Sequence, residues 1–226
     1  MDYIVDNNIA TLAFDDGKVN AVGPRFLDDI NAGLDRALAE QVDAIILRGR
    51  KGIFSGGFDL EEFKKSTELG MAMVTRGFDL LLRLYSFPLP LIAACTGHGI
   101  AMGAFIIMAC DTRIGSQGQF KISLPETAIG MALPPLLLAL SADRIAPQHM
   151  TRVALQSEVF NPEQAVDAGF IDETVAPELL DVRAMEVAQK LASLPQAQYA
   201  ENKLSIRART LQAMENSLAA MATAKH

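Results

Sequence analysis

Glu126 is the carboxylate whose surroundings best suit proton transfer. It lies in residues 120–131, a segment in which most side chains are apolar. Burial among apolar neighbours raises the pKa of a carboxyl group, and a base with a pKa near neutrality exchanges protons efficiently. The alternative is an exposed Glu at the start of a helix, which the preceding Pro125 allows. These residues alone leave both interpretations open.

Two glycine-rich segments could place backbone N–H groups close to a ligand. Residues 52–60 follow a short apolar run, and their glycines permit close backbone approach. Residues 90–105 are typical of a strand, a turn at 97–99 and an apolar helix, whose amino end carries unpaired N–H groups and a positive dipole. Such donors stabilise an oxyanion. Plain turns and a closely packed helix explain the same glycines, and His98 among them is more typical of a packed histidine than of a catalyst.

The elements that must position these segments alternate between strand and helix. Two apolar runs around Asp6-Asn7-Asn8 predict a hairpin in residues 2–14. Further strands are expected at 44–47, 91–95, 111–114 and 170–175, where apolar runs indicate burial on both faces. Helices are expected from Pro24, over 69–85, 102–109, 134–141, 147–155 and 162–168, and from 177 onward with a break at Pro195. The predicted class is α/β, with a core over 1–176 and a helical region over 177–226.

Composition argues against several classes of function. The 226 residues are 50% hydrophobic and 21% charged, which predicts a folded chain with a large core. A net charge of −7 without a basic stripe argues against nucleic acid as a partner. Cys95 and Cys110 lie in apolar runs, which indicates small buried side chains in a reducing compartment. No His/Cys pair has the spacing of a metal site.

Two features bear on membranes and targeting. The first apolar run is not preceded by a basic signal region. Residues 84–110 lack charged side chains over a length that could span a bilayer, but Pro88, Pro90 and three glycines interrupt them. We therefore expect a cytoplasmic protein that does not cross a membrane.

Four motifs together resemble the crotonase superfamily, the enoyl-CoA hydratases and isomerases. They are FSGGFDL at 54–60, AACTGHGIAMG at 93–103, ACDTRI at 109–114 and PETAIG at 125–130. The similarity extends from the N-terminal hairpin to about Val175. It implies a crotonase spiral of repeated ββα units followed by a short C-terminal helical region. It also implies acyl-CoA thioester substrates and assembly into a homotrimer or a dimer of trimers.

The resemblance also implies roles for particular residues. The backbone N–H groups of Phe58 and Met102 would hold the thioester oxygen, and Glu126 would be the catalytic carboxylate. The adenine end of coenzyme A would lie along two segments that contain Asn20, Ala21, Phe54, Ser55 and Gly56. Coenzyme A is part of the substrate, so neither a separate cofactor nor a metal is expected.

Phe105 is the main departure from the hydratase pattern. It occupies the position at which hydratases carry another catalytic Glu, and 3,2-enoyl-CoA isomerases resemble this chain in having an apolar residue there. One carboxylate can remove a proton at C2 and return it at C4. We therefore expect an isomerase of fatty acid metabolism. The alternatives are an enoyl-CoA hydratase or other lyase in which His98 replaces the missing Glu, and an acyl-CoA-binding protein with little turnover.

Overall fold

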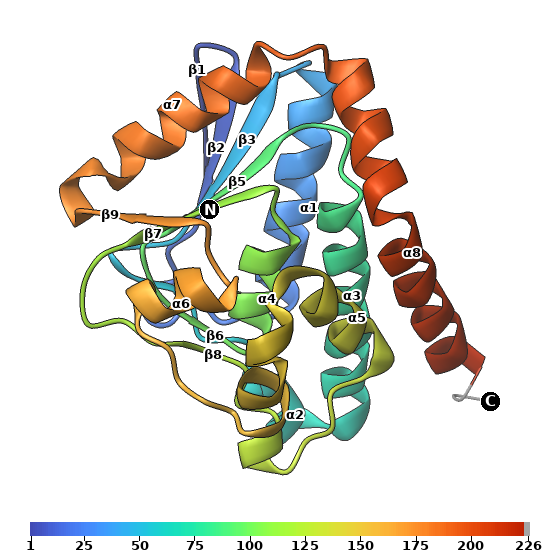
Figure 1. The fold of residues 1–226 in the computed structure, drawn as a ribbon. Helices are drawn as coiled ribbons and strands as arrows, with labels where there is room; N and C mark the ends of the chain where they lie inside the picture. The colour runs from blue at the N-terminus through green and yellow to red at the C-terminus, as the bar shows by residue number, and fades with distance from the viewer. Residues whose placement is uncertain (224–226) are drawn as a thin grey trace.

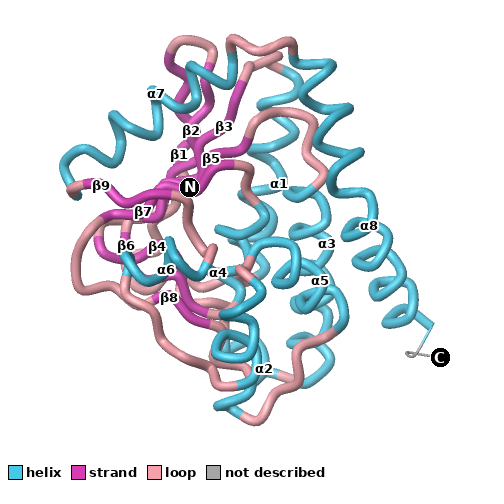
Figure 2. Tube along the Cα trace, viewed as in Figure 1, coloured by secondary structure: helices cyan, strands magenta, loops and turns pink. Residues whose placement is uncertain are grey.

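The computed structural model describes residues 1–223 as two sheets and the helices that cover them (Figures 1 and 2). The larger sheet has the order β1-β2-β3-β5-β7-β9. Its strands are β1 Asp2–Asp6, β2 Ile9–Ala13, β3 Ala44–Arg48, β5 Leu91–Cys95, β7 Thr112–Ser116 and β9 Glu173–Val175. β1 and β2 form the predicted antiparallel hairpin, and the other pairs are parallel. The hairpin turn is Asn7-Asn8, whose φ angles of 49° and 61° suit a type I′ turn.

The helices surround the two sheets. They are α1 Pro24–Ala39, α2 Leu60–Lys65, α3 Thr67–Tyr85, α4 Met102–Ala109, α5 Pro135–Arg144, α6 Pro162–Ala168, α7 Leu180–Ala192 and α8 Gln196–Thr223. Ile45 and Leu47 point into the main core, which also contains buried residues of α1, α3 and α4. Ile46 and Ile92 point the other way and pack with residues of α7, which crosses that face of the strands in Figure 1. Burial on both faces explains the continuous apolar runs.

The smaller sheet contains three parallel strands, β4 (Gly52–Ser55), β6 (Gly97–Ile100) and β8 (Ile122–Ser123), with β6 in the centre. A strand of the larger sheet, a strand of the smaller sheet and then a helix recur along the chain, as in β3-β4-α2, β5-β6-α4 and β7-β8-α5. This is the repeated ββα architecture that the resemblance to the crotonase superfamily implies.

The prediction of a turn at 97–99 was wrong. These residues belong to β6 and pair with strands on both sides. Glycine is required at Gly97 because the strands lie unusually close together: a methyl group there would be 2.0 Å from the backbone of Gly52. The glycines therefore mark a close approach between strands rather than a change of chain direction.

The other predicted elements are present, with shifts at their ends. Residues 147–155 form a 3₁₀ turn at Pro147–His149 and a π-helical turn at Thr151–Leu155 instead of one helix. The last strand is shorter than predicted because Phe170 donates its N–H to Ala165 O over 2.9 Å and so turns back onto α6. Short α2 was not predicted. No helix within residues 1–223 is long and apolar enough to cross a membrane.

Helix α8 packs against α3 and α5 of its own chain (Figure 1). Near its start, Lys203 Nζ donates to Phe87 O over 2.7 Å, to Leu89 O over 2.8 Å and to Asp111 Oδ2 over 2.6 Å. Arg207 lies 2.9 Å from the other oxygen of Asp111. All three charged side chains are buried, and a buried charge needs a partner. This network fixes α8 on the core. Of the predicted helical region 177–226, residues 224–226 lie outside the described residues.

Candidate active site

The three segments that could do chemistry all follow strands of the smaller sheet. Phe58, Met102 and Glu126 come within three residues of the ends of β4, β6 and β8 respectively. Because these strands are parallel, their carboxyl ends meet at one edge, which is where ligands bind in many α/β proteins. The fold therefore brings the two predicted N–H donors and the predicted carboxylate to the same edge of one sheet.

The N–H group of Phe58 donates to no acceptor within residues 1–223. The chain on either side of it pairs with Val22: Val22 N donates to Gly57 O over 2.8 Å, and Asp59 N donates to Val22 O over 3.2 Å. In this parallel pairing the middle residue directs its own N–H away from the partner. Phe58 therefore presents a free donor on the side opposite Val22.

The N–H group of Met102 likewise donates to no acceptor among the described residues. Met102 is the first residue of α4, where an N–H has no acceptor inside the helix and the dipole is positive. Gly57 connects the two donors: a methyl group on it would lie 3.5 Å from Met102 N and 3.0 Å from the Cβ atom of Ala101. Two neighbouring free N–H groups can bind a single developing oxyanion.

Ala101 holds the strained backbone that precedes α4. Its φ of 51° and ψ of −124° lie where residues with a Cβ atom are rarely found. Ala101 N donates to Ser123 O over 3.0 Å, and its carbonyl accepts from Phe105 N over 3.1 Å. Strain of this kind persists where surrounding contacts impose it, and it occurs most often at functional sites. The sequence carried no signal for it, because the residue is not a glycine.

Glu126 is buried, with 8% of its surface exposed. Its Oε2 atom is buried without a hydrogen-bond partner in the part of the chain that the structure describes. Burial raises the pKa of this carboxyl group above its usual range. A buried carboxylate without a partner is costly for a fold, and a perturbed pKa of this origin is typical of catalytic groups. Glu126 does stand at the start of a short 3₁₀ helix, Thr127–Ile129, but it is buried, so the prediction of an exposed residue was wrong.

The backbone after Glu126 is held from outside the sheet. Thr127 Oγ1 donates to Ala154 O over 2.9 Å, and Ala128 N donates to Ser157 Oγ over 3.1 Å. Ala154 belongs to the π-helical turn, an irregularity that is frequent at functional sites. These two bonds fix the direction in which the chain leaves Glu126.

Phe105 and His98 have the surroundings of structural residues. Phe105 is fully buried within α4, all of whose residues are buried. His98 Nδ1 accepts from Lys121 N over 2.9 Å, and its ring meets the edge of Phe120 with centroids 5.7 Å apart. These contacts hold His98 on β6, four residues before Met102, and leave only Nε2 for proton transfer.

Comparison with known proteins identifies the family to which this chain belongs. A family model described as enoyl-CoA hydratase/isomerase matches residues 5–225. The chain belongs to the enoyl-CoA hydratase/isomerase family. Its fold is the crotonase fold: a structure of a Mycobacterium tuberculosis protein named as an enoyl-CoA isomerase has a TM-score of 0.94 and 37% identity, over 98% of this chain and 97% of that one. Another structure of the same protein is named as a probable enoyl-CoA hydratase.

Relatives in this family carry two different names. A probable enoyl-CoA hydratase of Bacillus subtilis is 30% identical over 218 residues, which cover 89% of this chain and 82% of that protein. The mitochondrial enoyl-CoA delta isomerase 1 of Rattus norvegicus is 29% identical over 191 residues, 83% of this chain and 66% of that protein. The family makes the chain an acyl-CoA enzyme and leaves hydration and isomerisation as its two candidate reactions.

The two segments predicted to contact coenzyme A lie side by side. Ser55 Oγ donates to Asn20 O over 2.7 Å, and the Asn20 side chain donates to Phe54 O over 3.1 Å. Asn20, Phe54 and Ser55 are buried and hold the segments together, whereas Ala21 is half-buried and Gly56 is exposed. Of the five predicted contacts, Ala21 and Gly56 are therefore the ones that a ligand can reach directly.

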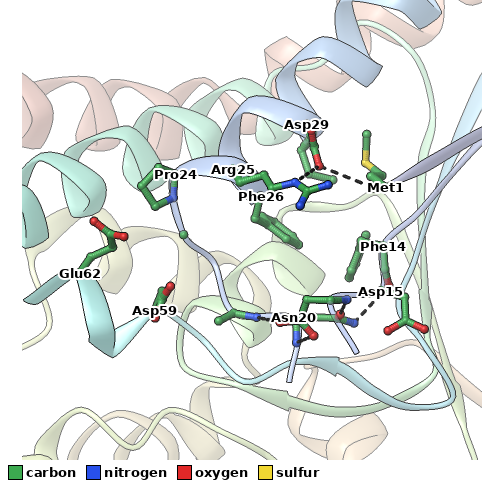
Figure 3. A pocket seen from close by; sticks show the side chains of 14 residues that line it. Met1, Phe14, Asp15, Asn20, Pro24, Arg25, Phe26, Asp29, Asp59 and Glu62 are labelled. Carbon is green, nitrogen blue, oxygen red and sulfur yellow. Dashed lines mark hydrogen bonds and ion pairs between the residues drawn. The ribbon is translucent and has the colours of Figure 1, made fainter. Parts of the chain in front are cut away.

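A cavity of about 510 Å³ opens beside Asn20 and Ala21 (Figure 3). The rings of Phe14 and Phe26 line it together with five acidic side chains, Asp15, Asp16, Asp29, Asp59 and Glu62. Three of these carboxylates are paired with cations: Asp15 with Arg50, Asp29 with Arg25 and the amino group of Met1, and Glu62 with Lys65. Carboxylates repel phosphate groups. The ion pairs offset most of this negative charge, and Asp16 and Asp59 are the acidic side chains of the lining outside them.

Proposed function

We propose that this protein is a 3,2-enoyl-CoA isomerase in which Glu126 is the only catalytic proton carrier. One observation carries the proposal: a buried Glu126 carboxyl, whose Oε2 atom has no hydrogen-bond partner among the described residues, is combined with a fully buried Phe105 on α4. Hydration needs one group that activates water and another that delivers a proton to the α-carbon. No residue of α4 is acidic, so the helix that supplies the other carboxylate in hydratases supplies none here.

In the proposed reaction the thioester oxygen accepts hydrogen bonds from Phe58 N and Met102 N. The Glu126 carboxylate takes a proton from C2, and the electrons of that C–H bond form a dienolate whose negative oxygen the two N–H groups stabilise. Protonated Glu126 then gives the same proton to C4, and the double bond ends between C2 and C3. The carboxylate is regenerated, and neither water nor an oxidant is consumed.

Relatives support both this reaction and its main rival. The rat relative is named as an isomerase and the Bacillus subtilis relative as a probable hydratase. Two structures of one Mycobacterium tuberculosis protein carry both names, enoyl-CoA isomerase and probable enoyl-CoA hydratase. A hydratase would need a substitute for the missing Glu, and His98 is the available imidazole. Its Nδ1 already accepts a backbone N–H, which favours the isomerase.

An ultraviolet assay separates the candidates. Isomerisation of a 3-enoyl-CoA makes the absorbance of the conjugated thioester appear, and hydration of a 2-enoyl-CoA makes it disappear. We expect the first change to dominate. The second change alone would identify a hydratase, and neither change together with tight binding would identify an acyl-CoA-binding protein.

Thermal stability measures substrate binding without catalysis. A ligand that binds only the folded state adds about 2.7 kcal/mol at a concentration one hundred times its Kd. A saturated acyl-CoA should therefore raise the Tm, and the matching free fatty acid should raise it much less. Equal shifts with both compounds would contradict recognition of the coenzyme A portion.

Assembly and location are part of the same proposal. We propose a homotrimer or a dimer of trimers, because Ile129, Met131, Leu155 and Val159 are each at least 50% exposed and burial in an interface would remove them from water. A monomer in light scattering would contradict this. A cytoplasmic location agrees with Cys95 and Cys110, which are free and buried. Cell fractionation tests it.

A further inference from the structure

Two phenylalanine rings rest on glycines of α3. A methyl group on Gly77 would lie 2.6 Å from the Cε1 and Cζ atoms of Phe58, and one on Gly70 would lie 2.3 Å from Cδ1 of Phe63. The glycines are seven residues apart, about two helical turns, so they share one face of α3. Any larger side chain at either position would have to displace a ring.

The contact at Gly77 involves both oxyanion residues. The Cε atom of Met102 would lie 3.3 Å from a methyl group on Gly77, and the Phe58 ring centroid is 6.4 Å from that of Phe78. Met102 is buried, whereas Phe58 is only half-buried despite these contacts. The residues with the two free N–H groups therefore direct their side chains to one point on α3, and the ring of Phe58 keeps a free side.

We propose that the Phe58 side chain, held in place by Gly77, limits the length of the acyl chain that the site accepts. This inference rests on the proposed acyl-CoA function. A thioester oxygen bound by Phe58 N and Met102 N lies about 3 Å from each nitrogen, so the acyl chain begins beside these two side chains. The ring closes the path from that point toward the face of α3 that carries Gly77 and Gly70. Short acyl chains are therefore preferred over long ones.

Two substitutions change the barrier that the Phe58 ring forms, in opposite ways. Phe58→Ala removes the ring and opens the path to α3. Gly77→Ala adds a methyl group where the tip of the ring now lies, so the ring must shift away from α3 toward the substrate. Gly70→Ala is the matched control, because it introduces the same change on the same helix face against a ring that belongs to Phe63, outside the oxyanion pair.

The measurement is the Kd of butyryl-, octanoyl-, dodecanoyl- and hexadecanoyl-CoA by calorimetry. We expect Phe58→Ala to lower the ratio of the hexadecanoyl to the butyryl Kd at least about tenfold, the scale on which apolar pockets discriminate chain size. Gly77→Ala should raise the ratio and Gly70→Ala should leave it unchanged. In the double variant Phe58→Ala/Gly77→Ala the effect of Gly77→Ala should become much smaller, because no ring remains to be displaced and only the 3.3 Å contact with Met102 Cε is left.

Three results would overturn the inference. They are an unchanged ratio in Phe58→Ala, equal shifts in Gly77→Ala and Gly70→Ala, and a full Gly77→Ala effect in the double variant. If Phe58→Ala does not fold, Gly77→Ala and its control provide the same test with Phe58 intact. A wild-type protein that binds none of the four thioesters would instead refute the proposed function itself, so the two failures are distinguishable.

Discussion

Replacing Glu126 with Gln separates the chemistry of this residue from its shape. Gln keeps the volume of the side chain and cannot carry the proton. Isomerase activity should fall by about 10²–10⁴, the usual effect of general acid–base catalysis, which corresponds to about 3–5.5 kcal/mol of transition-state stabilisation. The affinity for a saturated acyl-CoA should stay within about twofold, because the N–H groups of Phe58 and Met102 are unaltered.

The same substitution should stabilise the protein at neutral pH. The pKa of Glu126 is raised in the folded state because the carboxyl is buried, so keeping it ionised costs stability. Gln removes the charge, although the end of its amide that replaces Oε2 is still buried without a partner. The gain should be about 1–2 kcal/mol, or about 2–8 °C in Tm for a chain of this size.

The stability difference between Glu126→Gln and wild type should depend on pH in a definite direction. Below the ordinary carboxyl pKa of 4.5, both folded and unfolded wild type hold the proton, and the advantage of Gln disappears. As pH rises from there through the raised folded pKa, wild type loses stability relative to the variant. Thermal melts across this range, together with the ultraviolet assay, measure both effects. Full activity in Glu126→Gln, or a Tm advantage that is largest in acid, would refute the reasoning.

Three other substitutions test the remaining parts of the structure. Phe105→Glu should lower the Tm, because the position is fully buried. It should also raise the rate of hydration of a 2-enoyl-CoA above that of wild type. An unchanged hydration rate would argue that position 105 is not where the hydratase Glu is missing. Gly57→Ala should displace the backbone of the two donors, because the φ of Gly57 is 96° and its methyl group would be 3.0 Å from Ala101. The kcat should fall by about 10²–10³, the effect of losing an oxyanion donor. A wild-type kcat would contradict the role of the two donors. Asp111→Ala leaves Lys203 without its counter-charge and should cost about 3–5 kcal/mol in urea unfolding; a cost below about 1 kcal/mol would show that the network does not anchor α8.

Continuous apolar runs made most of the fold predictable. The strand Leu91–Cys95 and the helix Met102–Ala109 have the predicted bounds, because both are buried on all sides and contain no polar interruption. The two glycine-rich segments could also be located, since residues 52–60 follow an apolar run and residues 90–105 contain one, whereas the motif at 125–130 was assigned through the family resemblance. Pro24 and Pro195 marked the starts of α1 and α8 for the same local reason.

Features that depend on distant segments could not be predicted in this way. Gly97 and Gly99 are strand residues only because β4 and β8 pair with them, and neither partner is local in sequence. The positive φ of Ala101 occurs where its N–H donates to the carbonyl oxygen of Ser123, a residue distant in sequence, and leaves no mark on the sequence. The fit of Phe58 on Gly77 likewise depends on how α3 packs. Tertiary contacts determine all of these features, and they shape the candidate site most directly.

Transfer of a hydrogen label tests the single-carboxylate mechanism most directly. A 3-enoyl-CoA carrying deuterium at C2 is converted in ordinary water, and mass spectrometry measures deuterium at C4 of the product early in the reaction. Because Glu126 is buried, the deuteron that it takes from C2 should exchange slowly with water. We predict that part of the product carries deuterium at C4 and that Glu126→Gln abolishes this transfer. Product whose C4 hydrogen comes entirely from water would contradict proton transfer by one carboxylate.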